Sequence, residues 1–472
     1  MTDAQSLSLR FLGAARTVTG SKHLLQAGDH QILIDCGLFQ GLKPLRERNW
    51  QALPLKASQI DTVLLTHAHL DHVGYLPRLV GQGYNRRVFC TPATAELAKV
   101  VMLDAAHLQE EDAERANRKR YTKHNPAQPL FTVADAERAV KLLQPVGYHR
   151  PLAVANGFSA EFINAGHLLG SGYIRITHQA TGRTVLFGGD LGRYGRPVLP
   201  DPEPVAEADV LLVESTYGDR VHEPDDSGER LATIINDTVE RGGKLIIPAF
   251  ALGRIEEVLY WIGRLEDERR IPSLPVFVDS PMAAAVLASY RNRLNELDPE
   301  IVDAAGSQRA SNDRRLCAFC TDQLKVVTSI AESRAVQESN APAIVVSSSG
   351  MATGGRVLHH LVRALPDARN TILFVGYQSP GTRGRQLRDG AKTVRIHWQE
   401  IPVRAEIAGI DSMSAHADSN EIIRWLRGFV RPPSATYLVH GEPEPMDALR
   451  RRIESELGWT VHTPVHQEQV AL

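Results

Sequence analysis

The sequence predicts an α/β protein of two parts, one rich in short strands and one built as a parallel α/β sheet. Three observations lead to this prediction. Short apolar strands broken by glycine fill the first part of the chain, and four strand–loop–helix units follow one another in the middle. The tail then returns to strands and one helix.

The first part of the chain begins as a β-meander and continues into a helical region. LSLRFLGA, SKHLLQAG and HQILIDCG alternate apolar and polar residues, and DTVLLTHAH is a buried strand. Helical periodicity then runs over roughly 94–143. Within it, the polar stretch EEDAERANRKRYTKHNPAQ is either a solvated loop or helix face, or a basic edge that touches a polyanion. Strands resume with AEFINAGH, GYIRIT and TVLFGGD.

The middle of the chain repeats one pattern four times. KLIIPAF, PVFVDSP, AIVVSSSG and TILFVGYQ are each an apolar strand that ends in a loop and is followed by a helix. Consecutive units of this kind predict a parallel sheet with flanking helices. In such sheets, ligands bind beyond the carboxyl ends of the strands.

Size and composition set outer limits. A chain of 472 residues is long for one core, so two or three domains are expected. The net charge of −2 creates no general attraction to nucleic acid, so any such binding must use local basic patches. We expect a cytoplasmic protein with no membrane contact, because no apolar run is long enough to span a bilayer and only four cysteines are present. The Cys317/Cys320 pair lacks the second pair that a zinc knuckle needs.

The sequence HAHLDH follows a buried strand directly. It brings His67, His69, Asp71 and His72 together on one loop. Imidazole and carboxylate are typical zinc ligands, and a loop anchored to a rigid strand can direct several of them at one point. The spacing therefore predicts a metal site.

Further ligands are expected where other strands end. His167 ends FINAGH, Asp190 ends TVLFGGD, and His440 ends TYLVH. One catalytic zinc uses about three protein ligands, so seven candidates predict two ions.

These motifs resemble the metallo-β-lactamase superfamily. GAARTVTGS, LIDCGLFQG, HAHLDH, NAGHLLGSG and GGDLGR all look like its hydrolase signatures. The resemblance implies an αββα sandwich fold with two Zn²⁺ ions. It implies that His67, His69 and His167 hold one ion, that Asp71, His72 and His440 hold the other, and that Asp190 bridges them.

The middle region resembles the β-CASP subfamily, whose members cut RNA or DNA. VESTYGDR, PAFALGR, VDSPMA, SSSGMATGGR, GYQSPGTRGRQL, SAHAD and LVHGE carry this likeness. The chain is most similar to prokaryotic relatives of the endonuclease subunit of the pre-mRNA 3′-cleavage complex. The likeness implies residues 1–210 and 395–472 as one hydrolase domain and 211–394 as an inserted β-CASP domain. Histidine at position 440 is typical of the RNA-cutting branch.

The implied activity is zinc-dependent hydrolysis of single-stranded RNA, with a hydroxide held between the two metals attacking phosphorus. Asp71, Glu214 and His416 are expected to take part in the chemistry, with His416 as general acid and Glu214 orienting it. The residues expected to contact phosphates lie in the insert: Ser348, Ser349, Gly350, Arg254 and Arg383.

Several alternatives stay open. A hydrolase of small esters, thioesters or lactams could use the same metal motif, although the insert argues against it. A catalytically dead scaffold would have lost ligands, and none is missing. The sequence does not determine whether cleavage is endonucleolytic or 5′ exonucleolytic. It also does not determine whether the chain forms a homodimer. His416, rather than His440, could be the second zinc's ligand.

Overall fold

The computed structural model describes residues 7–120, 122, 124–224, 226, 228–299, 301 and 319–472. The chain forms two compact units. Unit 1 contains residues up to 195, 201–221 and 416–472, and unit 2 contains 196–200 and 222–415. Among the described residues, no helix is both long and apolar enough to cross a membrane. Cys317 lies outside the described residues.

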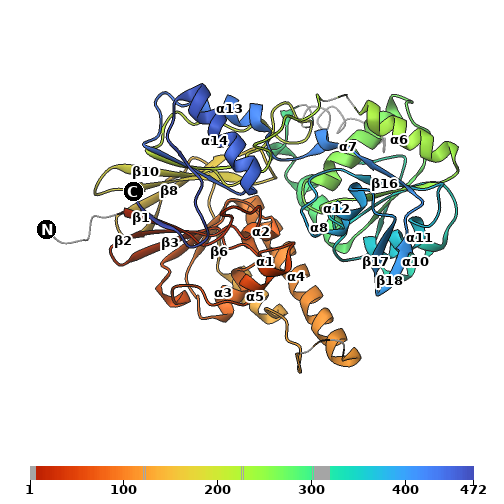
Figure 1. Cartoon of the computed structure of the whole chain (residues 1–472), viewed down its shortest axis with the longest axis horizontal. Coiled ribbons are helices and arrows are strands. Elements are labelled where there is room, and N and C mark those ends of the chain that lie inside the picture. Colours follow the sequence, from red (N-terminus) through yellow and green to blue (C-terminus); the bar gives the residue numbers. More distant parts are fainter. Residues whose placement is uncertain are drawn as a thin grey trace. The chain divides into compact units, whose positions relative to one another are not determined.

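Unit 1 is built on two seven-stranded sheets (Figure 1). The first has the order β22 (Gln469–Ala471), β1 (Leu7–Phe11), β2 (His23–Ala27), β3 (His30–Ile34), β4 (Thr62–Leu64), β5 (Val88–Cys90) and β6 (Leu143–Pro145). The second has the order β21 (Val461–His462), β20 (Ala435–Val439), β11 (Val210–Glu214), β10 (Arg183–Phe187), β9 (Gly172–His178), β8 (Phe158–Asn164) and β7 (Leu152–Ala155).

The two sheets of unit 1 pack face to face around an apolar core. Alternation along the strands decides which side chains enter it. In β11, Val210 and Leu212 join this inner core, whereas Leu211 and Val213 lie on the outer face. There they pack with apolar side chains of α13 (Ser419–Leu426) and α14 (Pro443–Leu457). Helices α1 (Lys43–Arg48), α2 (Leu70–Val73), α3 (Leu76–Gly81), α4 (Pro92–Lys119) and α5 (Val133–Lys141) complete the unit. The expected αββα sandwich is confirmed.

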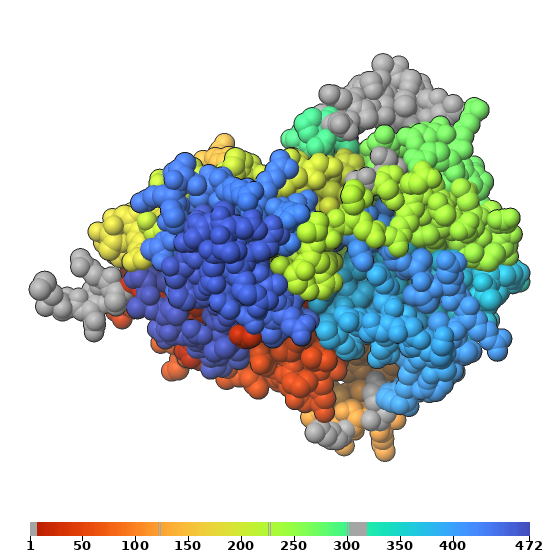
Figure 2. Space-filling model, turned by 45° about the horizontal axis from the view of Figure 1, so that its top comes forward, coloured from red at the N-terminus to blue at the C-terminus, as the bar shows by residue number. Residues whose placement is uncertain are grey.

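The two ends of the chain meet in unit 1. Strand β22 pairs antiparallel with β1, and Figure 2 shows the dark blue C-terminal segment against the red N-terminal one. The first half of the polar stretch is helical, since α4 continues to Lys119. Its charged residues there are mostly exposed.

Unit 2 is a six-stranded, all-parallel sheet. Its order is β14 (Gln323–Val327), β13 (Pro275–Asp279), β15 (Ala343–Ser347), β12 (Lys244–Pro248), β16 (Thr371–Phe374) and β19 (Glu406–Gly409). The flanking helices are α6 (Glu229–Glu240), α7 (Arg254–Asp267), α8 (Pro281–Asn292), α10 (Ile330–Glu338), α11 (Val357–Ala364) and α12 (Arg383–Arg388). A hairpin of β17 (Thr393–Ile396) and β18 (Gln399–Pro402) lies beside α11 in Figure 1.

The parallel sheet of unit 2 confirms the four predicted strand–loop–helix units, whose strands are β12, β13, β15 and β16. Unit 2 also extends past the expected boundary at residue 394. Strand β19 pairs in parallel with β16, so the chain up to Ala415 groups with this unit. Pairing along an open sheet edge, which composition does not reveal, decides where this segment lies.

Candidate metal centre

Parallel strands bring the predicted ligands of unit 1 to one edge of the sandwich. β10, β11 and β20 are mutually parallel neighbours, so their carboxyl ends meet. Asp190 follows β10, Glu214 ends β11, and His440 follows β20. His67 follows β4 of the facing sheet, and His167 lies in the turn after β8.

The side chains converge into sets that could each hold a metal ion. In each set, the ligand atoms all lie within 4.8 Å of one another. One set is His67, His69, His167 and Asp190, and a second is Asp71, His72 and His440. A third combines Asp190, His416 and His440. All seven predicted ligands are therefore close together.

Asp190 lies at the centre of the cluster. Its Oδ2 is 3.4 Å from His67 Nε2 and 3.5 Å from His167 Nε2. Its Oδ1 is 3.3 Å from His72 Nε2 and 3.6 Å from His440 Nδ1. Both oxygens are buried, and neither has a hydrogen-bond partner in the described part of the chain. A buried carboxylate without donors is costly, so this environment fits bound cations.

The protonation of the first histidine set also fits a metal. Burial lowers the pKa of His67 to about 3 and of His69 to about 4, and it lowers the pKa of His167 well below its usual value. These rings are therefore neutral at pH 7, which is the form that ligates metal. The donor set thus supports divalent metal binding.

The second set is supported by a buried carboxylate that the sequence analysis missed. Asp35 Oδ2 lies 2.8 Å from His72 Nδ1, and Asp35 also accepts hydrogen bonds from the backbone and hydroxyl of Thr66. Together with Asp190 it raises the pKa of His72 well above its usual value, against the opposing effect of burial. A carboxylate of this kind fixes the ring orientation of a ligating histidine. Asp35 follows the strand HQILI directly, the same context that identified Asp190.

The loop after β3 holds the HAHLDH segment through its backbone. Cys36 N–H donates to His72 O, and Leu38 N–H donates to Leu70 O. Ser21 N–H, from the connection between β1 and β2, donates to Asp71 O. The buried Lys22 ammonium donates to Gly37 O at 2.5 Å and thereby anchors this loop.

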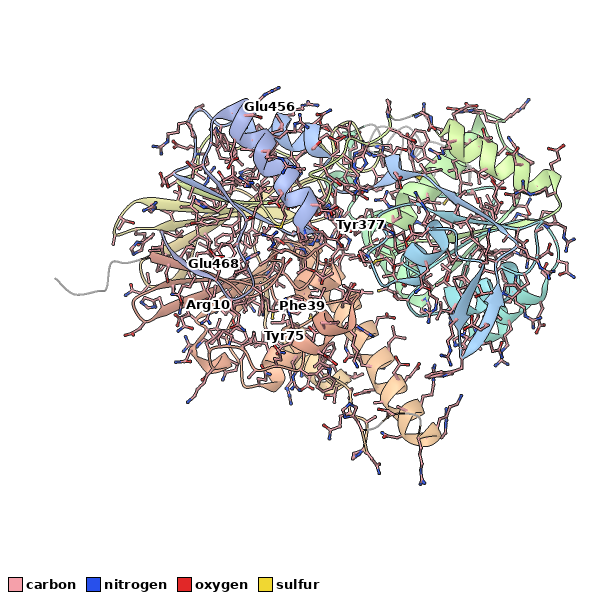
Figure 3. All side chains as sticks on the ribbon, in the orientation of Figure 1. Arg10, Phe39, Tyr75, Tyr377, Glu456 and Glu468 are labelled. Atoms are coloured by element: carbon pink, nitrogen blue, oxygen red, sulfur yellow. The ribbon has the colours of Figure 1, made fainter. Side chains whose placement is uncertain are left out.

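Lys22 is enclosed by aromatic rings. Its Nζ lies 4.5 Å from the ring centroid of Phe39 and 5.0 Å from that of Tyr75, and both rings are labelled in Figure 3. Burial lowers the pKa of Lys22 to about 8. Cation–π contacts of this kind compensate part of the cost of burying an ammonium group.

Glu214 and His416 form a separate pair at the edge of the cluster. His416 Nδ1 lies 3.0 and 3.1 Å from the two carboxylate oxygens of Glu214. Glu214 is fully buried and also accepts hydrogen bonds from Leu191 N–H and the Thr216 hydroxyl. Burial lowers the pKa of His416, but the carboxylates of Glu214 and Asp190 outweigh it and raise this pKa to about 9. His416 keeps 18% of its side chain exposed, so it can reach a substrate.

The residues expected to contact phosphate lie in unit 2. Ser348 and Ser349 follow β15, and their hydroxyls contact those of Ser280 and Thr353 at 2.8 and 2.9 Å. Gly350 packs closely, because a Cβ there would lie 2.7 Å from the Phe250 ring.

The two arginines predicted in unit 2 are engaged with the protein. Arg254 is buried and donates to Glu257 at 2.5 Å. Arg383 donates to the carbonyl oxygens of Ala352, Thr353 and Arg395, so it connects the serine loop to the β17–β18 hairpin.

Comparisons with protein families match three consecutive parts of the chain. A metallo-β-lactamase superfamily domain matches residues 24–188, and a β-CASP domain matches 255–387. A Zn-dependent metallo-hydrolase RNA specificity domain matches residues 400–464.

Individual relatives extend this likeness over more than nine-tenths of the chain. Ribonuclease TTHA0252 of Thermus thermophilus is 39% identical over 438 residues, which cover 93% of this chain and 94% of that protein. Transcription termination factor FttA of Methanocaldococcus jannaschii is 29% identical, covering 92% of this chain and 67% of that protein. A crystal structure of a protein of unknown function from Enterococcus faecalis has 13% identity and a TM-score of 0.53, covers 99% of this chain, and supports the fold alone. The chain therefore belongs to the β-CASP subfamily of the metallo-β-lactamase superfamily.

Proposed function

We propose that this chain is a ribonuclease that holds two zinc ions and cuts single-stranded RNA internally. It is a metal-dependent nuclease, as its family membership and ribonuclease relatives support. The observation that carries the two-metal proposal is Asp190. Its two buried oxygens face different histidine sets, which is the arrangement expected of a carboxylate shared by two cations.

The ligand assignment follows from the two sets. His67, His69 and His167 would hold one ion, and Asp71, His72 and His440 would hold the other, with Asp190 between them. When bound, the ions supply Lewis acidity that lowers the pKa of water and stabilises charge on the phosphoryl oxygens. Imidazole and carboxylate donors with no thiolate suit zinc.

Glu214 and His416 would complete the reaction. Glu214 accepts the Nδ1–H of His416, which leaves Nε2 to carry the proton that the departing oxygen needs. As water forms the new bond to phosphorus, it gives up one proton to solvent. As the P–O bond to the leaving group breaks, His416 Nε2 passes its own proton to the leaving oxygen. Asp71 belongs to the same centre, because its Oδ2 lies 3.2 Å from His440 Nε2.

RNA is the substrate class because the most informative relative is named a ribonuclease and the chain carries a complete parallel insert. Ser348, Ser349 and Gly350 would bind phosphate at the carboxyl end of β15, where ligands of parallel sheets bind. Arg254 and Arg383 would position the neighbouring loops. We also propose that the protein acts in the cytoplasm. Light scattering of the purified chain tests whether it forms a homodimer.

Metal analysis and a substrate comparison test the proposal. Purified chain should contain about two zinc ions and cleave a fluorescent single-stranded RNA, with no turnover of a chromogenic lactam. Circular RNA should be cut as readily as linear RNA of the same sequence. Metal content near zero, or lactam turnover without RNA cleavage, contradicts the proposal. If the chain cuts linear RNA and leaves circular RNA intact, it is a 5′ exonuclease rather than an endonuclease.

A further inference from the structure

The tip of the β17–β18 hairpin has an unfavourable backbone for its residues. His397 and Trp398 form its two-residue turn, with φ values of 50° and 69°. A turn with positive φ at both positions favours Asn-Gly, and bulky side chains are rare there. Residues kept in such a conformation often serve a function.

Packing does not account for the tryptophan. The Trp398 side chain is 66% exposed, whereas Val394, Ile396 and Ile401 on the inner side of the hairpin are buried. The hairpin is therefore held by those aliphatic side chains. Tryptophan is usually well buried in folded proteins, and here most of this large ring is exposed at a loop tip, where a ligand can reach it.

One cation lies beside this ring, and a pair of stacked rings includes its neighbour in the turn. The Arg395 guanidinium carbon lies 5.1 Å from the Trp398 ring centroid. The rings of His359 and His397 stack at 4.7 Å with an interplanar angle of 28°. Planar groups from the hairpin and from helix α11 are thus gathered on one patch of unit 2.

The patch also has excess positive charge. Lys392, Arg395 and Arg363 are exposed, and no ion pair joins them to a carboxylate among the described residues. Arg363 follows His359 by one helical turn, so both lie on the same face of α11. Glu400, the one acidic residue of the hairpin, is the cross-strand partner of Arg395, so three cations stand against one carboxylate. A ligand with flat faces and negative charge complements this surface.

We infer that Trp398 is a base-stacking site for single-stranded RNA, with Arg395 beside the ring and Lys392 at the opposite end of the hairpin as cations for its phosphates. This inference rests on the proposed function and adds an RNA-binding surface outside the metal centre. Stacking needs an unpaired base, since paired bases are already stacked and do not present a free face. The site should therefore distinguish single strands from duplexes.

The test measures binding of a fluorescent, uncleavable 2′-O-methyl phosphorothioate oligonucleotide to the full chain by anisotropy. Trp398→Ala should weaken binding of the single strand by about fivefold or more, with little change for the duplex. Trp398→Phe should restore most of the affinity, because phenylalanine also stacks. Ile330→Ala is the matched control, since Ile330 is equally exposed at 66% in the same unit but has no ring.

Three outcomes overturn the inference. Trp398→Ala could bind the single strand as the wild-type chain does, which would leave the patch to a protein partner. It could lose single-strand and duplex binding equally, or Ile330→Ala could lose as much, and either result would indicate a general effect on the surface. Failure of the proposed function is distinguishable, because the wild-type chain itself would then neither bind nor cut RNA.

Discussion

At the scale of single residues, the two histidines of the tail are held very differently. His440 is 3% exposed and follows a buried strand, and its backbone N–H donates to Ala14 O at 2.7 Å. His416 keeps 18% of its side chain exposed and faces the Glu214 carboxylate. A ligand needs rigid support, whereas a general acid must reach the leaving oxygen. This contrast favours His440 as the ligand.

Substitution of each histidine should separate the two roles. His416→Ala should lower kcat by about 10²–10⁴-fold while zinc content stays at the wild-type level. His440→Ala should lose activity together with much of the second zinc. His178→Ala is the control, because His178 is also buried but lies at the end of β9 and contacts Thr181. If the His416 variant loses zinc and the His440 variant keeps it, His416 is the metal ligand and His440 is not.

At the scale of elements, the loop after β3 packs so closely against the HAHLDH segment that no additional side-chain atom fits between them. A Cβ atom added to Gly37 would lie 1.6 Å from Asp71 O. Because the same loop donates hydrogen bonds to the carbonyls of His72 and Leu70, any shift of it moves the predicted ligands. Only glycine is compatible with this close approach.

Gly37→Ala should therefore reduce metal binding. We expect lower zinc content and a loss of RNA cleavage, because Asp71 and His72 must move to relieve the clash. Gly147→Ala is the control, since a Cβ there would meet only the Arg150 side chain at 3.7 Å. Metal analysis and thermal unfolding of both variants test the prediction, which is wrong if the Gly37 variant retains full zinc occupancy.

Helix α7 contains a buried acid that makes unit 2 sensitive to pH. Glu256 is fully buried, and burial raises its pKa from 4.5 to about 8. Well below pH 4.5 the carboxyl is neutral in folded and unfolded chains, so it contributes its full stability. As the pH rises above 4.5, the carboxyl ionises in the unfolded chain first. The stabilising contribution therefore falls progressively and is gone above about pH 8.

Glu256→Gln should remove this loss. The melting temperature of the variant should exceed that of the wild-type chain by more at pH 8 than at pH 5, because glutamine does not ionise. Calorimetry across this range makes the measurement. Glu240→Gln, at an exposed position ending α6, should follow the wild-type chain. If the melting temperatures of the variant and the wild-type chain differ equally at pH 5 and pH 8, Glu256 does not have a raised pKa.

At the scale of the whole molecule, the side-chain clusters of the described residues that could hold a metal ion all lie in unit 1. A ligand that binds only the folded state stabilises it by about 2.7 kcal/mol at a hundred times its dissociation constant. We propose that the three segments of unit 1 fold as one discontinuous hydrolase domain around the metals. Removal of the metals should then affect that unit alone.

Chelation therefore should lower one of two calorimetric transitions. Added chelator should shift the unit 1 transition to lower temperature and leave that of unit 2 in place. Returning zinc should restore it, whereas magnesium should not. A scan in which both transitions fall together would contradict separate stabilisation of unit 1.

The sequence alone determined much of the fold and the metal centre. HAHLDH, and the polar residues that follow β10 and β20, are local signals, because a strand end fixes the direction of the next side chain. The four units with β12, β13, β15 and β16 were equally readable, since each combines a short apolar strand with a periodic helix. Such patterns need no knowledge of distant residues.

The tertiary structure decided what depends on contacts between distant segments. It placed Asp35 beside His72 and turned Arg383 toward three carbonyl oxygens. It also added β19 to the sheet of unit 2, where the sequence had suggested a return to the hydrolase domain. Hydrogen bonds and sheet pairing across long sequence separations leave no periodic trace, so only the folded chain reveals them.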